Sequence, residues 1–437
     1  MSNVRDRSVI RRQVELLETA HGYFGSQVLF SANELGVFGA LNERPRSASE
    51  LAPVLGARAD GLERLLNACV ALGLLTVDGG VYANTETADE VLVPDRDGYL
   101  GNWLRLMARW MNAWTRLTET VRTGEPAHDA QLHLGGDLEQ TREFLLGMDD
   151  YARLRGSEIV RYLDLGGGLE LIDVGGGPGS YAVLFTQEWP DLNVTVFDLP
   201  GVVPLARQQA DQAGVGERVA VKPGNYYDDE FGSDYDVVFL SDTLHQESPE
   251  VCELILQKSY RALRPGGRVV VQAMFLNEDR VSPRWPVMHS LIMILIYGGG
   301  RAYTVEETKD LMERAGFVEC EHQQDPCQAV VASRPGYRAG DQSQGSLSFG
   351  IRKGSHRLAT RQRVVEQVLG GVSQSTMLGQ GRQATQRCEQ SEGWPGQARV
   401  VLQAVRDAPE DQLPAFSVTR DDPLQHVPPH PLRELDG

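Results

Sequence analysis

A glycine-rich loop follows a short apolar run that contains an acid, in the stretch Leu171-Ile-Asp-Val-Gly-Gly-Gly-Pro-Gly-Ser180. The order predicts a strand, a tight turn and a helix over 181–187, the arrangement at which α/β proteins bind nucleotides. Glycine is needed because the ligand lies against bare backbone. The spacing Gly175-x-Gly177-x-Gly179 is shorter than the G-x-G-x-x-G loop that holds a pyrophosphate. With Asp173 two residues ahead, it favours a nucleoside whose tail is an amino acid, S-adenosylmethionine.

Further polar side chains follow the next two strands. Asp198, with Leu199 after it, ends the run VTVFD, and an acid at the tip of a second strand accepts hydrogen bonds from ribose hydroxyls. Asn225 and Tyr226 follow the third strand, where a carboxamide can read the adenine amino group and an aromatic ring can cover the base. The alternative interpretations are a helix N-cap or turn former for Asp198 and an ordinary turn for the second segment.

His245 stands at the end of the fourth strand, in Ser241-Asp-Thr-Leu-His245. The carboxyl ends of strands in an open α/β sheet face the ligand crevice, so the imidazole is predicted to point at the reactive end of the cofactor. A neutral imidazole, with an ordinary pKa of about 6.5, can take a proton from a hydroxyl as the oxygen attacks carbon. The alternative is a structural or surface histidine.

Alternating strands and helices from 169 to about 332 must position these residues. The pattern predicts strands over 171–174, 193–197, 218–222, 237–240 and 269–271, and helices over 202–213, 250–263 and 305–315. Buried apolar strands separated by amphipathic helices predict a parallel sheet covered on both faces. The segment Leu263-Arg-Pro-Gly-Gly-Arg268 is interpreted as the turn into the fifth strand.

Residues 1–100 predict a mostly helical domain that ends in a hairpin. A capping box opens a helix at 47–50, an apolar stripe runs along 58–75, and a glycine turn joins two short strands over 76–82. Helix, helix and hairpin form a winged-helix pattern. DNA binding is disfavoured because Asp60 and Glu63 offset Arg58 and Arg64 on the second helix. Dimerisation or packing is the favoured role.

Two further regions differ in composition. Residues 101–165 predict helical connectors rich in large apolar side chains, which either pack in a core or line an acceptor pocket. Residues 336–437 are rich in Gln, Gly, Ser, Arg and Pro, and apart from possible helices at 360–369 and 398–405 they predict a disordered tail. A translated non-native reading frame is the alternative. The domain bodies are therefore expected over 1–100, 101–165 and 166–335.

The composition of the whole chain disfavours several classes of partner and location. Its 437 residues carry a formal charge of −18, which disfavours nucleic acid or an anionic membrane as the main partner. The five cysteines are scattered without C-x-x-C spacing, which predicts a reducing compartment and no metal site. The N-terminus lacks the apolar core of a signal peptide, and the run 291–297 is too short to span a bilayer. A cytoplasmic protein is expected.

Taken together, the motifs resemble those of class I S-adenosylmethionine-dependent O-methyltransferases of the caffeate and acetylserotonin type and their bacterial natural-product relatives. The resemblance covers about residues 15–334 and rests on SQVLFSANELGVFGAL, LIDVGGGPGSYA, VTVFDLPGVV, GNYYDD, LHQE, LRPGGRVVV and ERAGF. It implies a winged-helix-like dimerisation domain, a Rossmann-like domain with an added antiparallel strand at the edge, and a homodimer in which the partner helps to close the site.

The resemblance also implies roles for residues that the motifs align. Asp173, Gly175 and Gly177 would hold the methionyl part, and Ser241 would lie near the amino-acid end of the cofactor. Arg155, on the helix before the first strand, would touch the methionine carboxylate. The acceptor pocket would be largely apolar. Its candidate residues are Trp103, Met107, Met148, Trp285, His289 and Met293.

The chain departs from the family at the acids that support the catalytic histidine. Gln246, Ala273 and Ala302 stand where carboxylates are usual, so His245 is expected to lack a carboxylate partner and to be a weak base. Proximity, which can supply about 7–11 kcal/mol, would then carry most of the catalysis, and an easily ionised acceptor would suit the site. The leading hypothesis is an O-methyltransferase for a small hydroxylated acceptor. The alternatives are C- or N-methylation, a cofactor-sensing DNA regulator and a non-methylating cofactor binder.

Overall fold

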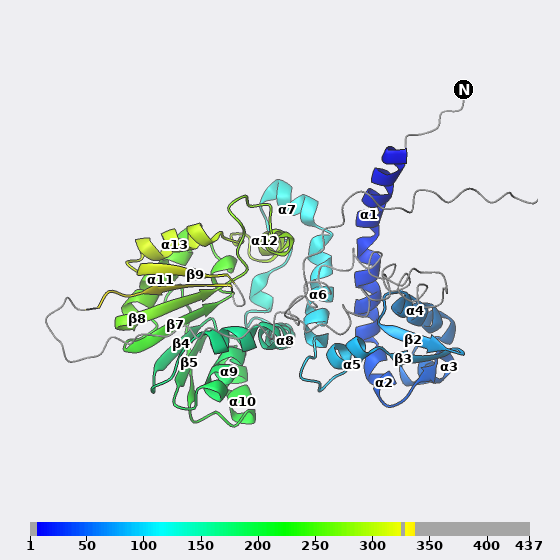
Figure 1. The fold of residues 1–437 in the computed structure, drawn as a ribbon, viewed down its shortest axis with the longest axis horizontal. Helices are drawn as coiled ribbons and strands as arrows, with labels where there is room; N and C mark the ends of the chain where they lie inside the picture. The colour runs from blue at the N-terminus through cyan, green and yellow to red at the C-terminus, as the bar shows by residue number, and fades with distance from the viewer. Residues whose placement is uncertain (1–6, 325–327, 337–437) are drawn as a thin grey trace, which may run out of the picture. The chain divides into compact units, whose positions relative to one another are not determined.

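The computed structural model describes residues 7–324 and 328–336 of the chain (Figure 1). The possible helices at 360–369 and 398–405, and all but the first residue of the predicted tail at 336–437, lie outside the described residues. Among the helices that are described, none combines the length and the apolar character needed to cross a membrane.

The N-terminal part is a helical domain with a small antiparallel sheet. Within the described residues its strands lie in the order β1-β3-β2. The elements are α1 (Arg7–Glu34), α2 (Val37–Asn42), β1 (Arg46–Ser47), α3 (Ala48–Val54), α4 (Ala59–Ala71), β2 (Leu75–Asp78), β3 (Val81–Asn84) and α5 (Glu86–Leu92).

Local sequence signals account for this domain. Ser47 and Glu50 form the predicted capping box at the start of α3. The β2–β3 turn contains Gly79 and Gly80 with φ of 54° and 82°, the left-handed pair that suits a two-residue hairpin. Helix α4 is shorter than the 58–75 stretch predicted for it, because Gly73 adopts φ 73° just after its last turn. The predicted winged-helix pattern is confirmed.

Three helices connect this domain to the larger sheet. They are α6 (Gly101–Trp114), α7 (Leu117–Thr123) and α8 (Leu138–Tyr162). Helix α6 contacts both α1 and α8. The buried Asp150 carboxylate of α8 accepts hydrogen bonds from the backbone N–H groups of Asn102 and Trp103, at 2.8 and 3.1 Å. The first N–H groups of a helix have no partner within the helix, so this carboxylate caps the start of α6.

The larger domain is built on a sheet whose seven strands, within the described residues, follow the order β6-β5-β4-β7-β8-β10-β9. The first five are parallel, and β10 runs antiparallel to both of its neighbours. The strands are β4 (Glu170–Val174), β5 (Asn193–Asp198), β6 (Val219–Pro223), β7 (Tyr235–Ser241), β8 (Leu263–Gln272), β9 (Val318–Gln323) and β10 (Ala329–Ser333). This arrangement confirms the predicted Rossmann-like domain.

Helices cover both faces of that sheet (Figure 1). Alternate strand residues divide between two cores: Ile172 and Val238 pack on one face, and Leu171 and Val237 on the other. The first face is covered by α11 (Pro249–Ala262) and α13 (Val305–Arg314), and the second by α8, α9 (Ser180–Glu188) and α10 (Val203–Gln212). The remaining helix, α12 (Arg284–Ile296), belongs to a separate apolar cluster with α6 and α8.

Two details of the sheet differ from the sequence reading. Strand β8 already begins at Leu263, inside the predicted turn, because Leu263 pairs with Tyr235 before the register shifts at the turn through Gly266 (φ 82°). The antiparallel strand, β10, lies one position inside the edge, and β9 forms the edge itself.

Candidate active site

The glycine loop after β4 is held by the carboxylate at the end of β5. Asp198 accepts hydrogen bonds from the backbone N–H groups of Gly177, at 2.8 Å, and of Leu199, at 2.7 Å. Gly175 and Gly177 adopt φ of 73° and 55°, a region that side chains disfavour. A Cβ added to Gly175 would lie 2.9 Å from Thr243 Oγ1, so both conformation and space require glycine at this position.

Asp173 places an unpaired, buried carboxyl group beside this loop. Its carboxylate is buried, and neither oxygen has a hydrogen-bond partner among the described residues. Burial, together with the nearby charge of Asp198, raises the Asp173 pKa to about 8. Burial also raises the pKa of Asp198 to about 6, although its two backbone hydrogen bonds oppose the shift. A buried carboxylate without a partner fits a ligand that carries positive charge.

A cavity of about 560 Å³ joins these groups. Most of the residues predicted to bind the cofactor line it. They are Asp173, Gly175, Gly177, Asp198, Leu199, Asn225, Tyr226 and Ser241. The same cavity is also lined by Met148, the segment 128–131, Leu134, Phe144, Ile296 and Tyr297.

The wall beside Asn225 contains a carboxylate that sequence reasoning missed. Glu247 is buried and accepts hydrogen bonds from the hydroxyls of Tyr226 and, at 2.7 Å, of Tyr227. Burial, reinforced by the charge of Glu247, raises the pKa of Tyr226, and that of Tyr227 is raised in the same way. Lys258 donates to the backbone carbonyls of Tyr226 and Tyr227, at 2.8 and 3.0 Å, which fixes this wall from behind. The only sequence signal was an acid two residues after the predicted base.

His245 lies behind the cavity wall rather than on it. Its neighbours Asp242, Thr243 and Gln246 line the cavity, whereas its own ring packs edge-on against His289, with ring centroids 4.6 Å apart. Burial, with a smaller contribution from the Arg155 charge, lowers the pKa of His245 to about 3. The imidazole is therefore neutral at physiological pH.

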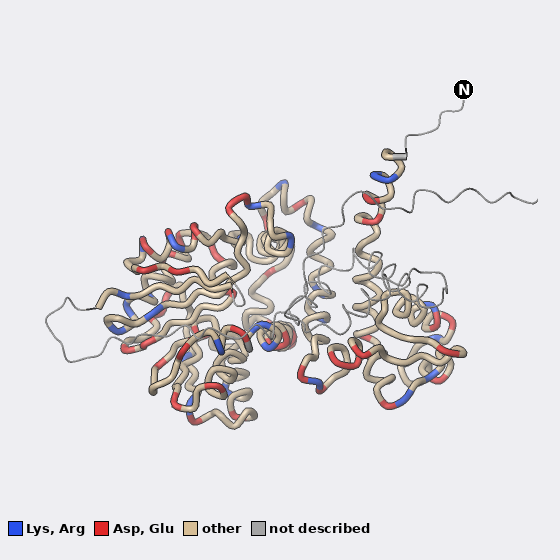
Figure 2. Tube along the Cα trace, viewed as in Figure 1, with Lys and Arg blue, Asp and Glu red and all other residues tan. Residues whose placement is uncertain are grey.

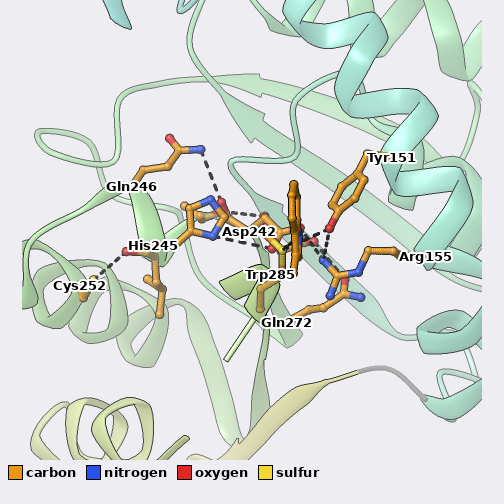
Figure 3. Close-up of polar contacts among 12 residues, drawn as sticks. Tyr151, Arg155, Asp242, His245, Gln246, Cys252, Gln272 and Trp285 are labelled. Carbon is orange, nitrogen blue, oxygen red and sulfur yellow. Dashed lines mark hydrogen bonds and ion pairs between the residues drawn. The ribbon is translucent and has the colours of Figure 1, made fainter. Parts of the chain in front are cut away.

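His245 Nδ1 has no hydrogen-bond partner among the described residues, but a carboxylate that the sequence analysis did not foresee lies close to it. Asp242 Oδ1 lies 3.7 Å from His245 Nδ1, and Asp242 Oδ2 forms an ion pair with Arg155 at 3.1 Å (Figure 3). Gln246, Ala273 and Ala302 do lack carboxylates, as the sequence states. The acid comes instead from the loop three residues before the histidine, a place that the family pattern did not indicate.

Comparison with known proteins identifies the family. Residues 114–318 match the profile of the O-methyltransferase domain, and residues 17–94 match that of the O-methyltransferase dimerisation domain. The chain is 34% identical to acetylserotonin O-methyltransferase of Bos taurus over 337 residues, 73% of this chain and 97% of the relative. The chain belongs to the O-methyltransferase family. It is an enzyme that uses S-adenosylmethionine.

Other relatives of this methyltransferase act on aromatic compounds. It is 33% identical to 3-hydroxy-5-methyl-1-naphthoate 3-O-methyltransferase of Streptomyces sahachiroi, over 70% of this chain and 89% of the relative. The crystal structure of human N-acetylserotonin methyltransferase with S-adenosylmethionine superposes with a TM-score of 0.69 at 28% identity, covering 77% of this chain and 100% of the other. An O-methyltransferase from neocarzinostatin biosynthesis, in complex with S-adenosylmethionine and 2-hydroxy-5-methyl naphthoic acid, gives 0.60 at 26% identity, covering 71% and 95%.

A smaller share of the predicted acceptor residues than of the predicted cofactor residues lines the cavity. Met148 lines it, whereas Trp103, Met107, Trp285 and Met293 do not and belong to the apolar cluster that Met148 packs against. Trp103 stacks on Tyr151 with ring centroids 4.5 Å apart. His289 is buried against His245 and Trp285. Arg155 does not line the cavity itself but contacts two residues that do, Asp242 and Tyr151.

Over residues 7–324 and 328–336, no group of three or more His, Cys, Asp or Glu side chains is arranged to hold a metal ion.

Proposed function

We propose that this methyltransferase transfers a methyl group to a hydroxyl of a small aromatic or polyketide-like acceptor. We also propose that His245, whose neighbours Asp242, Thr243 and Gln246 line the cavity, turns its imidazole toward the bound acceptor and takes the hydroxyl proton. The observation that carries the proposal is a single cavity lined by two kinds of residue. The glycine loop with the unpaired Asp173 carboxyl, and the apolar side chains of Phe144, Met148 and Ile296, line the same space. A site for a cationic methyl donor and a site for an apolar acceptor are thereby continuous.

The cofactor end can be assigned residue by residue. S-adenosylmethionine supplies a methyl group activated by the positive sulfonium. We assign its methionyl part to Asp173, the loop at Gly175–Gly177 and Ser241, and the ribose to Asp198 beside Leu199. Asn225 and Tyr226 take the adenine. Asp198 also accepts hydrogen bonds from the backbone of Gly177 and Leu199, and it therefore fixes the loop that the cofactor would lie against.

The acceptor end suits a flat apolar molecule. Phe144, Met148 and Ile296 supply apolar surface, and the Tyr297 hydroxyl supplies a polar group whose direction is set by His133, at 3.1 Å. The cluster of Trp103, Met107, Trp285, His289 and Met293 packs behind and beside this end. The relatives named for naphthoate substrates support an aromatic acceptor of similar size.

The depressed pKa of His245 limits which hydroxyl can react. A base whose pKa is about 3 is neutral at working pH but accepts a proton weakly. A phenol whose oxygen ionises readily needs less help than an aliphatic alcohol. Acidic phenols are therefore the proposed substrate class, with orientation in the cavity supplying the larger share of the rate.

We also propose that the enzyme is a homodimer that works without metal or nucleic acid. Helix α1 leaves large apolar side chains exposed, among them Leu16 at 70% and Leu17 at 54%. Such a stripe suits burial against a second copy, and it lies in or next to the segment that matches the dimerisation family. Figure 2 shows acidic and basic residues interspersed along the chain around α4, and Arg58 pairs there with Asp60. Such a mixture of charges does not suit a phosphate backbone.

Incubation with S-adenosylmethionine and a panel of phenols tests the proposal. We expect a product heavier by one methyl group, formed faster from more acidic phenols. Replacing His245 with Ala should lower kcat by about 10²-fold or more while the affinity for S-adenosylhomocysteine stays within a few fold. Full activity in H245A, or methylation of carbon or nitrogen in place of oxygen, would contradict it.

A further inference from the structure

We propose that Asp242 is the positioning carboxylate of His245, in place of the acids that the family resemblance led us to expect at Gln246, Ala273 and Ala302. The inference rests on the proposed role of His245 as the base. Asp242 would act through the imidazole, by orienting it and by stabilising the charge that forms on it.

Asp242 lies between the histidine and an arginine (Figure 3). Its Oδ2 is ion-paired with Arg155 at 3.1 Å, and its Oδ1 faces His245 Nδ1 at 3.7 Å. Both Oδ1 and Nδ1 are buried, and neither has a hydrogen-bond partner in the part of the chain that the structure describes. Two unsatisfied polar atoms of complementary character therefore face each other. A shift of less than 1 Å would join them in a hydrogen bond.

The backbone of Asp242 is held in an unusual conformation for this purpose. Its φ is 52°, in the left-handed region, and its N–H donates to the Gln272 carbonyl at 2.9 Å. A non-glycine residue in this region carries strain, which persists when the surroundings fix it and which is common at functional sites. Here the conformation turns the side chain from the end of β7 toward both Arg155 and His245.

Among the described residues, the charged and titratable groups around the His245 ring come from three elements. Asp242 precedes it in its own turn, Arg155 comes from α8, and His289 comes from α12. Asp242 is the anion in this set. Arg155 neutralises part of its charge and is itself held by the Tyr151 hydroxyl, at 3.5 Å.

This arrangement would fix the tautomer of the base. A carboxylate that accepts a hydrogen bond from Nδ1–H leaves Nε2 without a proton, ready to receive one from the acceptor. The same carboxylate stabilises the imidazolium that forms when the proton moves. Arg155 would hold the carboxylate in place and keep the histidine neutral before the reaction.

Replacing Asp242 with Asn tests the inference, with the exposed Asp228→Asn as the matched control. We expect D242N to lower kcat about 10–100-fold with little change in KM. The acid limb of its pH–rate profile should move to lower pH, because loss of the anion lowers the pKa of the histidine. D242E should recover part of the rate. A wild-type pH profile in D242N, or a loss confined to the affinity for S-adenosylhomocysteine, would overturn the proposal.

A second measurement needs no variant at Asp242. NMR of ¹⁵N-histidine-labelled wild-type enzyme reports which ring nitrogen of His245 carries the proton, and the His245 signal is assigned by its absence from H245Q. We expect the proton on Nδ1. A proton on Nε2 would overturn the proposal even if D242N failed to fold. The proposed function fails separately, when H245A keeps full activity. If H245A is inactive and D242N keeps the wild-type pH profile, only the role of Asp242 is wrong.

Discussion

Replacing Asp173 with Asn should stabilise the cofactor-free enzyme while weakening cofactor binding. The buried Asp173 carboxylate has no partner, and its pKa is raised from 3.8 to about 8. A raised carboxyl pKa means that the folded state binds the proton more tightly than the unfolded state does. The stability from this group is therefore complete below about pH 4 and is lost as the pH rises toward 8. The loss is roughly 1.4 kcal/mol per pH unit, or about 4 kcal/mol between pH 5 and pH 8.

Urea unfolding of the cofactor-free protein at pH 5 and pH 8 measures this effect. The free energy of unfolding of D173N minus that of the wild type should increase by about 4 kcal/mol between the two pH values. The exposed control Asp191→Asn should show a constant difference. Calorimetry at pH 8 should show D173N binding S-adenosylmethionine about 10–150-fold more weakly, because a hydrogen bond to a charged group contributes about 1.5–3 kcal/mol. A difference that is flat with pH, or unchanged affinity, would refute the reasoning.

Three further substitutions test other parts of the structure. Gly175→Ala should destabilise the enzyme more than Gly214→Ala in thermal melts. Both glycines have φ near 73°, but of the two only Gly175 would bring the added methyl against a neighbour, Thr243. Equal losses of stability would argue against that clash. Leu16→Asp should shift the protein to monomers in light scattering, whereas Val121→Asp, equally exposed on α7, should not; an unaltered dimer would place the interface elsewhere. Glu247→Gln should lower the affinity for S-adenosylhomocysteine several-fold in calorimetry, because the hydroxyls of Tyr226 and Tyr227 lose a charged hydrogen-bond acceptor. Wild-type affinity would show that the position of these two tyrosines does not depend on the charge.

The grouping of the proposed cofactor residues on one cavity could be predicted from the sequence because these residues obey local rules. Gly175 must adopt positive φ, and Asp198 is an acid at a strand tip. Both features can be recognised from the residues next to them in the sequence. The strand pattern then places Asn225 and Ser241 at the same edge of the sheet, and the structure puts them on one cavity.

The surroundings of His245 could not be predicted in that way. Asp242 reaches the histidine only because its backbone takes a left-handed conformation, and no residue type in the segment signals it. The acceptor residues depend on how α8 and α12 pack, which periodicity alone does not determine. Trp103 and Met293 are apolar enough for either a core or a pocket, and the structure places them in the cluster behind the cavity wall.

The most direct test of the central claim is to locate the transferred methyl group. The enzyme would be supplied with S-adenosylmethionine carrying a ¹³C methyl and with hydroxylated naphthoates, and the product examined by ¹³C NMR. The proposed function predicts a single methoxy signal from an aromatic oxygen, formed by the wild type and lost or strongly reduced in H245A. A labelled methyl on carbon or nitrogen, or equal transfer by H245A, would contradict it.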